Sequence, residues 1–150
     1  MLRLTPRQYR RIVAHCLDAE RDPETGLLYE ACGLLRGPVD ASGTPTGKIS
    51  GVYPCRNADA SAKTYTVDSR DYMPALRDAE ATGGSLVGVW HSHTHTRAYP
   101  SETDVRQAPD PGWLYAIVSL MPGADPVLRA YRIRAGEVAE VAVVLDGDVG

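Results

Sequence analysis

The feature that most constrains this chain is a short apolar run that ends in two histidines. Residues 86–90 have the composition of a buried β-strand, and the run continues directly into His91-Ser92-His93. Because side chains alternate between the two faces of a strand, His91 and His93 project to one face and Ser92 to the other. Two imidazoles on one face of a strand are a ready pair of metal ligands.

A carboxylate follows these histidines at the start of a predicted helix. Ser101 comes directly after Pro100 and is a good helix N-cap, so Asp104 would occupy the third helical position. His91, His93 and Asp104 then supply three of the four positions of a tetrahedral zinc site, and the fourth is left for water. An open position of this kind is typical of catalytic rather than structural zinc. Histidine-rich stretches are often ordinary surface or core, but a strand and a capped helix around this one favour a metal site.

The composition is that of an ordinary globular protein. The chain has 150 residues, of which 43% are apolar and 23% charged, and this fits a single domain over residues 1–150. A formal net charge of −3 argues against a nucleic-acid-binding surface, and no apolar run has the length of a membrane span. Three cysteines without CxxC spacing, and an N-terminus unlike a signal peptide, predict reduced thiols and a cytoplasmic location.

Signals for strands and helices follow one another along the whole chain. We expect strands at residues 2–4, 31–36, 48–54, 63–67, 86–90, 113–120, 127–133 and 138–145, and helices that begin after Thr5, at Asp68 or Ser69, and at Ser101. The last two strands form a hairpin around Arg134-Ala135-Gly136. Pro74 conflicts with the second helix unless that helix begins near Arg70 or Asp71. The order of elements predicts a mixed sheet with helices packed on it, an α+β or three-layer arrangement.

A second informative position is Glu30, an acidic residue immediately before the apolar strand at residues 31–36. Carboxylates are rarely fully buried without a partner, so a strand-end carboxylate that faces water is the simpler interpretation of Glu30 taken alone. Its position by itself therefore assigns it no chemical role.

Taken together, these residues resemble a known family. The motif HSH-x7-SxxD, formed by His91, His93, Ser101 and Asp104, and the upstream segment EACGLLRG resemble the JAMM (MPN+) zinc metalloproteases. The chain looks most like the bacterial Mec-type peptidases of that family, and the similarity extends over nearly the whole chain to the closing AYRI segment. The resemblance implies the JAMM/MPN (cytidine-deaminase-like) architecture, a curved mixed β-sheet flanked by helices.

The resemblance also implies a role for each matching residue. His91, His93 and Asp104 match the ligands of one Zn²⁺ per chain, and Glu30 matches the general base, against the simpler interpretation of its position. Ser101 matches a serine beside the metal. Zinc lowers the pKa of a bound water from about 15.7 to about 7. Glu30 would accept the water's proton, and the Ser101 hydroxyl would stabilise the oxyanion.

Four residues of the loop between the ligands have no assigned role. Thr94 stands where many family members have proline, and His95 is not required by the motif. His95 could follow the strand face and approach the metal, but we expect it on the substrate side or in solvent. Arg97 and Tyr99 are candidate substrate contacts, and simple exposure to solvent is an equal alternative for both.

The expected substrate also comes from the resemblance. Mec-type peptidases act on ubiquitin-like sulfur carrier proteins, so the implied reaction is hydrolysis of the amide bond between the carrier's C-terminal Gly-Gly tail and cysteine, which releases cysteine for cysteine biosynthesis. We expect the tail to dock as an added strand beside residues 86–90 or 63–67.

Three alternatives were weighed against this substrate and activity. A JAMM isopeptidase or processing protease for another ubiquitin-like protein would have the same site. A non-catalytic MPN scaffold would lack the ligands that this chain retains. A zinc nucleobase deaminase would carry H-x-E and P-C-x-x-C, and neither motif is present. The sequence leaves open the native carrier protein, the oligomeric state and any regulation.

Overall fold

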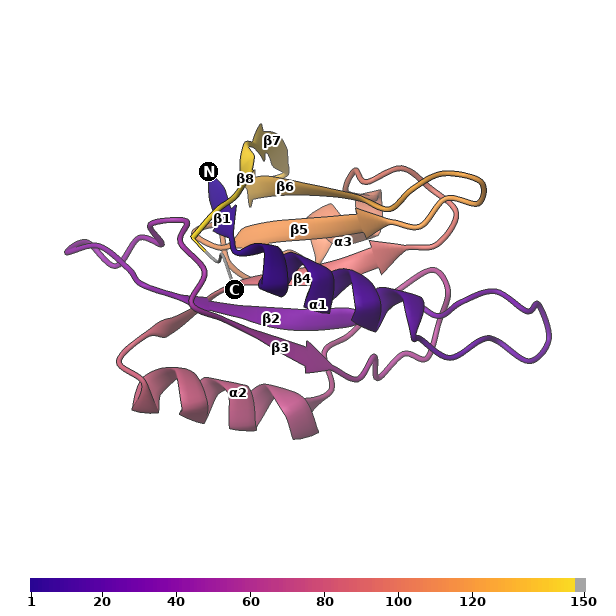
Figure 1. Ribbon diagram of the computed structural model, residues 1–150, viewed down its shortest axis with the longest axis horizontal. Helices are drawn as coiled ribbons and strands as arrows, with labels where there is room; N and C mark the ends of the chain where they lie inside the picture. The colour runs from indigo at the N-terminus through magenta and orange to yellow at the C-terminus, as the bar shows by residue number, and fades with distance from the viewer. Residues whose placement is uncertain (148–150) are drawn as a thin grey trace.

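A six-stranded mixed sheet forms the centre of the computed structural model, which describes residues 1–147 (Figure 1). The strand order is β3-β2-β4-β5-β6-β7, in which β4 and β5 are parallel and all other neighbours are antiparallel. The bounds of these strands are β2 (Cys32–Gly37), β3 (Gly51–Cys55), β4 (Ser85–His93), β5 (Leu114–Ser119), β6 (Val127–Arg134) and β7 (Glu137–Val141).

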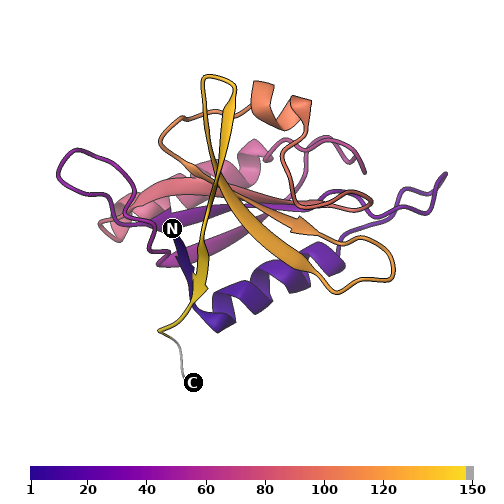
Figure 2. The same ribbon diagram turned by 90° about the horizontal axis from the view of Figure 1, so that it is seen from above.

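Helices cover both faces of this sheet and make three layers (Figure 2). Leu34 and Leu35 are neighbours in β2 and therefore point to opposite faces. Helix α1 (Pro6–Leu17) packs on the face of Leu35, whereas α2 (Ser69–Ala81) and the short α3 (Glu102–Arg106) pack on the face of Leu34. The expected α+β fold, a mixed sheet flanked by helices, is confirmed. Among the described residues, no helix combines the length and the hydropathy that crossing a membrane would require.

A bulge in β4 decides which residues share a face with the histidines. The pairing of β4 with β2 skips Val87, which is therefore an extra residue in β4. Leu86 and Val89 accordingly lie in the same core, under α2, although an odd number of positions separates them. From Val89 onward the alternation is regular, and it places His91 and His93 on the α2 face at the carboxyl end of the strand.

The C-terminal part departs from the prediction of one long strand over residues 138–145. The chain pairs with β6 only along β7 and then leaves the sheet. Its next segment, β8 (Val143–Leu145), pairs in parallel with β1 (Leu2–Leu4) and forms a separate two-stranded sheet. The expected turn is confirmed, since Ala135 and Gly136 have φ values of 49° and 81°, as a two-residue type I′ hairpin turn requires.

One further prediction was wrong in this region, and one was confirmed. Residues 63–67 are not a strand but part of a loop, and their single bridge joins Val67 to Asn57. Helix α2 begins at Ser69, with Asp68 as its N-cap, and it contains Pro74 in its interior. The predicted start at Asp68 or Ser69 is therefore confirmed, without the later start that would have accommodated Pro74. Helix α2 forgoes one backbone hydrogen bond at that proline.

The position of β4 also excludes one of the two expected docking edges. Strand β4 is hydrogen-bonded to β2 on one side and to β5 on the other. An added strand needs a free edge, so residues 86–90 cannot receive one, and of the two expected edges only residues 63–67 stay available.

Candidate metal centre

Three side chains each bring one ligand atom to a common point. His91 Nε2 lies 3.2 Å from His93 Nε2, and Asp104 Oδ2 lies 3.2 Å from the first nitrogen and 3.1 Å from the second. Zinc bonds of about 2.0–2.1 Å in a tetrahedron require ligand atoms about 3.3 Å apart. The triangle therefore has the size of one face of a tetrahedral zinc site. Two imidazoles and one carboxylate are also a ligand set that catalytic zinc uses.

The start of α3 orients the carboxylate of this triangle. The Asp104 backbone N–H donates to Ser101 Oγ over 3.0 Å, and the Ser101 backbone N–H donates to Asp104 Oδ2 over 2.9 Å. This reciprocal capping box confirms the predicted N-cap and the predicted third helical position. Because Ser101 Oγ accepts a hydrogen bond in the cap, its own hydrogen stays available for donation.

The loop after β4 orients the second imidazole. His93 Nδ1 lies 2.9 Å from the carbonyl oxygen of Arg97. A carbonyl only accepts hydrogen bonds, so the neutral ring carries its hydrogen on Nδ1 and presents a lone pair at Nε2. This is the arrangement by which an outer hydrogen bond aims a histidine at a metal.

The four loop residues without an assigned role contact one another in pairs. Thr94 is buried, and its Oγ1 lies 2.6 Å from Nδ1 of the exposed His95. The Arg97 guanidinium lies 4.8 Å from the centre of the Tyr99 ring. Substrate contacts by His95, Arg97 and Tyr99 stay predictions.

Burial and mutual contact shift the pKa values of the three ligands. Burial lowers the pKa of His91. Burial would raise the pKa of Asp104, but its hydrogen bonds with His91 and then His93 outweigh this effect and hold the pKa well below its usual range. Burial would likewise lower the pKa of His93, but its hydrogen bonds to Asp104 and the Arg97 carbonyl raise it overall. An ionised carboxylate shared by two imidazoles suits a bound cation.

Glu30, the predicted base, is buried and interacts electrostatically with His93 and Asp104. Its side chain is 5% exposed, and its Oε1 has no hydrogen-bond partner among the described residues. Burial raises the pKa of Glu30 to about 8; His93 opposes this shift, and Asp104 and Asp59 add to it. The water-facing interpretation of Glu30 is therefore wrong. A buried carboxylate oxygen without a partner is costly, so it fits a proton acceptor that works beside the ligands.

One aromatic residue beside the site had no predicted role. The Tyr65 ring stacks on the His91 ring, with the centroids 4.3 Å apart and the planes 20° from parallel. Tyr65 also lines a hollow of about 270 Å³ whose other walls come from Leu34, Tyr72, Val89 and Trp113. No local sequence signal could have predicted this stack, because it depends on how the loop before α2 folds back over β4.

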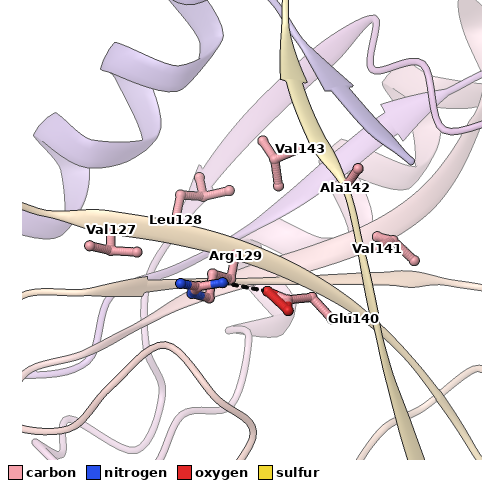
Figure 3. A pocket seen from close by; sticks show the side chains of 7 residues that line it. All are labelled: Val127, Leu128, Arg129, Glu140, Val141, Ala142 and Val143. Atoms are coloured by element: carbon pink, nitrogen blue, oxygen red, sulfur yellow. Dashed lines mark hydrogen bonds and ion pairs between the residues drawn. The ribbon is translucent and has the colours of Figure 1, made fainter.

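A second hollow lies away from these residues. Strand β6 runs along one side of a groove of about 480 Å³, and the chain from β7 into β8 forms the other side (Figure 3). Its charged residues are Arg129 and Glu140, which form an ion pair with an Nη1–Oε1 distance of 2.7 Å. None of the predicted site residues lines this groove.

Comparison with known proteins decides the family. Residues 6–134 match the family model Prok-JAB, described as prokaryotic homologs of the JAB domain. The chain belongs to this family. The match confirms the resemblance to the JAMM/MPN proteins that the ligand motif indicated.

Two similar proteins have names that state an activity, one a peptidase and one a desampylase. The chain is 40% identical over 114 residues to the CysO-cysteine peptidase of Mycobacterium tuberculosis. This match covers 76% of this chain and 75% of that protein. The chain is 30% identical over 118 residues to the desampylase of Haloferax volcanii, which covers 78% of each. The solution structure of protein DSY2949 from Desulfitobacterium hafniense has a TM-score of 0.81 at 33% identity, covering 99% of this chain and 94% of that one. This Prok-JAB protein is a hydrolase that acts on peptide or isopeptide bonds.

Proposed function

We propose that this protein is a zinc-dependent peptidase that cleaves cysteine from the C-terminal tail of a ubiquitin-like sulfur carrier protein. One Zn²⁺ would be held by His91, His93 and Asp104, and the released cysteine would enter cysteine biosynthesis in the cytoplasm. The observation that carries the proposal is the ligand triangle beside the buried, unpartnered Oε1 of Glu30. Similarity to the CysO-cysteine peptidase supports the identity of the substrate.

The residues around the triangle have distinct tasks in this reaction. A zinc ion held by His91, His93 and Asp104 would supply polarisation of the scissile carbonyl and would lower the pKa of water to about 7. Glu30 accepts a proton from the attacking water and then delivers it to the nitrogen of the departing cysteine. Its burial keeps other hydrogen-bond donors away from Oε1, so the carboxylate is free for both transfers.

Ser101 stabilises the charge that develops on the carbonyl oxygen. Its Oγ accepts the Asp104 N–H at the helix cap, and the hydroxyl hydrogen is left to donate to the oxyanion. A donor aimed at an oxyanion typically contributes about 2.7–4 kcal/mol to transition-state stabilisation. Ser101 can therefore act without breaking its cap.

The hollow beside the ligands suits the residues that precede the scissile bond. Val89 lies in its wall, two positions before His91 on the same face of β4. Tyr65 forms the wall nearest the ligands, and its backbone N–H and C=O have no hydrogen-bond partner within the described part of the chain. An extended tail can pair with this backbone as an added strand. Glycines at its end would pass the Tyr65 ring most easily.

A second candidate is an isopeptidase that removes a ubiquitin-like protein from a lysine side chain. The same ligands and base would hydrolyse that amide bond, and similarity to the desampylase favours this candidate. The two candidates differ in the group that leaves, which is one free amino acid in the first case and a whole protein in the second.

A direct test measures the intact mass of a purified carrier–cysteine conjugate incubated with the zinc-loaded enzyme. We expect the conjugate to lose the mass of one cysteine residue. A chelator should abolish this cleavage, and restored Zn²⁺ should bring it back. A carrier linked to a lysine side chain is assayed in parallel. Cleavage of the lysine conjugate alone would assign the second candidate, and cleavage of neither would contradict both.

A further inference from the structure

The loop between β3 and α2 has no regular structure, yet one side chain ties it together. Asn57 Nδ2 donates to the carbonyl oxygens of Glu30 and Thr64, each over 3.0 Å. Asn57 Oδ1 accepts the backbone N–H of Asp59 over 3.0 Å and that of Thr66 over 3.1 Å. These four bonds use both donors and both lone pairs of the amide, so no other side chain could replace it with the same bonds.

Two of the four bonds bracket the aromatic ring that covers the first ligand. Thr64 and Thr66 are the neighbours of Tyr65, and the Asn57 amide therefore holds the backbone on both sides of it. The Tyr65 ring in turn lies flat against His91, at 4.3 Å between centroids. A shift of this backbone would move the ring and free the His91 imidazole to rotate.

A third bond holds the base. The Glu30 backbone is fixed on both sides, because its N–H donates to the Ser61 carbonyl over 2.8 Å and its C=O accepts from Asn57. Within the described part of the chain, no hydrogen bond to the Glu30 carboxylate is observed, and Oε1 is buried without a partner. The placement of this carboxylate therefore depends on its backbone and on the loop packed around it.

We propose that Asn57 is a positioning residue that aligns the Glu30 carboxylate with the ligand His91. It acts through the Glu30 backbone on one side and through Tyr65 on the other, and it touches neither the substrate nor the metal. The inference rests on the proposed function, because it assumes that Glu30 acts as the base.

The test uses Asn57→Ala and the near-isosteric Asn57→Asp, which removes both donors, with Ser61→Ala as the matched control. Ser61 Oγ accepts the backbone N–H groups of Lys63 and Thr64 within the same loop, whereas the Ser61 carbonyl that holds Glu30 is kept in the control. We expect both Asn57 variants to lose about 100-fold in kcat with KM nearly unchanged, because small misplacements of a catalytic group cost about that much. Ser61→Ala should lie within about threefold of the wild type.

Two further measurements separate positioning from a structural role. When Asn57→Ala is added to Glu30→Gln, it should lower kcat little further, since the group it positions is already lost. Independent of activity, the visible spectrum of the Co²⁺-loaded protein should change in both Asn57 variants and match the wild type in Ser61→Ala. The proposal would be overturned if the fall in kcat of the double variant equalled the product of the two single falls. An unchanged Co²⁺ spectrum, or loss of the fold or of the metal in both Asn57 variants, would overturn it as well. If the wild type cleaves no conjugate, the proposed function fails, and the cobalt spectra still decide the role of Asn57.

Discussion

The groove between β6 and β8 and the candidate metal centre differ in how far their charged groups are exposed to water. In the groove between β6 and β8, Arg129 and Glu140 form their ion pair with side chains 55% and 49% exposed. At the carboxyl end of β4, near the triangle of His91, His93 and Asp104, Glu30 and His91 are 5% and 3% exposed. The groove thus has solvated charges, whereas the candidate metal centre has ionisable groups withdrawn from water. Burial of such groups, rather than the volume of a cavity, favours this end of the sheet as the functional site.

The physical reason is the screening of charge by water. An exposed ion pair contributes about 0–1 kcal/mol, because solvent competes for both partners. Water does not compete for a buried carboxylate. The pKa of such a group therefore depends on its burial and on the protein groups that surround it. Each of the following changes tests this contrast between the two regions.

Removal of a ligand should have the largest effect. Asp104→Ala takes away the anionic corner of the triangle, and we expect loss of stoichiometric zinc and a fall in turnover of about a thousandfold or more. Elemental analysis and the conjugate assay measure the two effects. Glu102→Ala removes an exposed carboxylate from the same helix turn and should retain both metal and activity. Full zinc occupancy in Asp104→Ala would contradict its assignment as a ligand.

Removal of the base should separate chemistry from metal binding. Glu30→Gln keeps the shape of the side chain but cannot accept the proton, so we expect full zinc content and a loss of about 10²–10⁴-fold in turnover. Glu24→Gln changes an exposed carboxylate at the surface and serves as the control. Wild-type turnover in Glu30→Gln would end the assignment of Glu30 as the base.

The buried carboxylate also predicts a pH dependence of stability in the metal-free protein. Burial raises the pKa of Glu30 from 4.5 to about 8, so between these values the folded state binds more protons than the unfolded state. Stability that Glu30 contributes below about pH 4.5 is therefore lost as the pH rises toward 8.

We expect the free energy of unfolding of Glu30→Gln, relative to that of the wild type, to rise by on the order of 2 kcal/mol between pH 5 and pH 8. Urea unfolding in the presence of a chelator measures the difference. Glu140→Gln, at the exposed pair, should show no such trend. If the difference in free energy of unfolding between Glu30→Gln and the wild type is constant across this range, the pKa of Glu30 is not raised.

The exposed ion pair should give the smallest effect. Arg129→Ala removes one partner of the pair in the β6–β8 groove, and we expect a change of less than about 1 kcal/mol in free energy of unfolding. Conjugate cleavage should stay at the wild-type rate. A large loss of activity would mean that this groove takes part in the reaction, and the contrast between the groove and the candidate metal centre would fail.

Local rules made part of the site predictable. Alternation along a strand placed His91 and His93 on one face, and the preference of serine for the N-cap placed Asp104 at the third position of α3. These relations involve residues close together in the chain, and the same local physics applies in any fold. The resemblance to the JAMM family then supplied Glu30, whose role its own neighbours did not indicate.

Contacts between distant segments decided the rest. Glu30 is buried because the loop around Asn57 closes over it, and residues 63–67 are a loop because side-chain bonds from Asn57 replace strand pairing. Likewise, the chain leaves β6 after β7 because β8 pairs with β1 at the other end of the sequence.

The sequence by itself therefore predicted the candidate ligands, the cap and the mixed sheet. Strand alternation, helix capping and the order of elements along the chain depend on near neighbours and on the period of the pattern. Only the tertiary structure decided that Glu30 is buried without a partner and that Tyr65 lies on His91. Burial and stacking depend on which remote backbone closes over a residue, and local patterns carry no information about that.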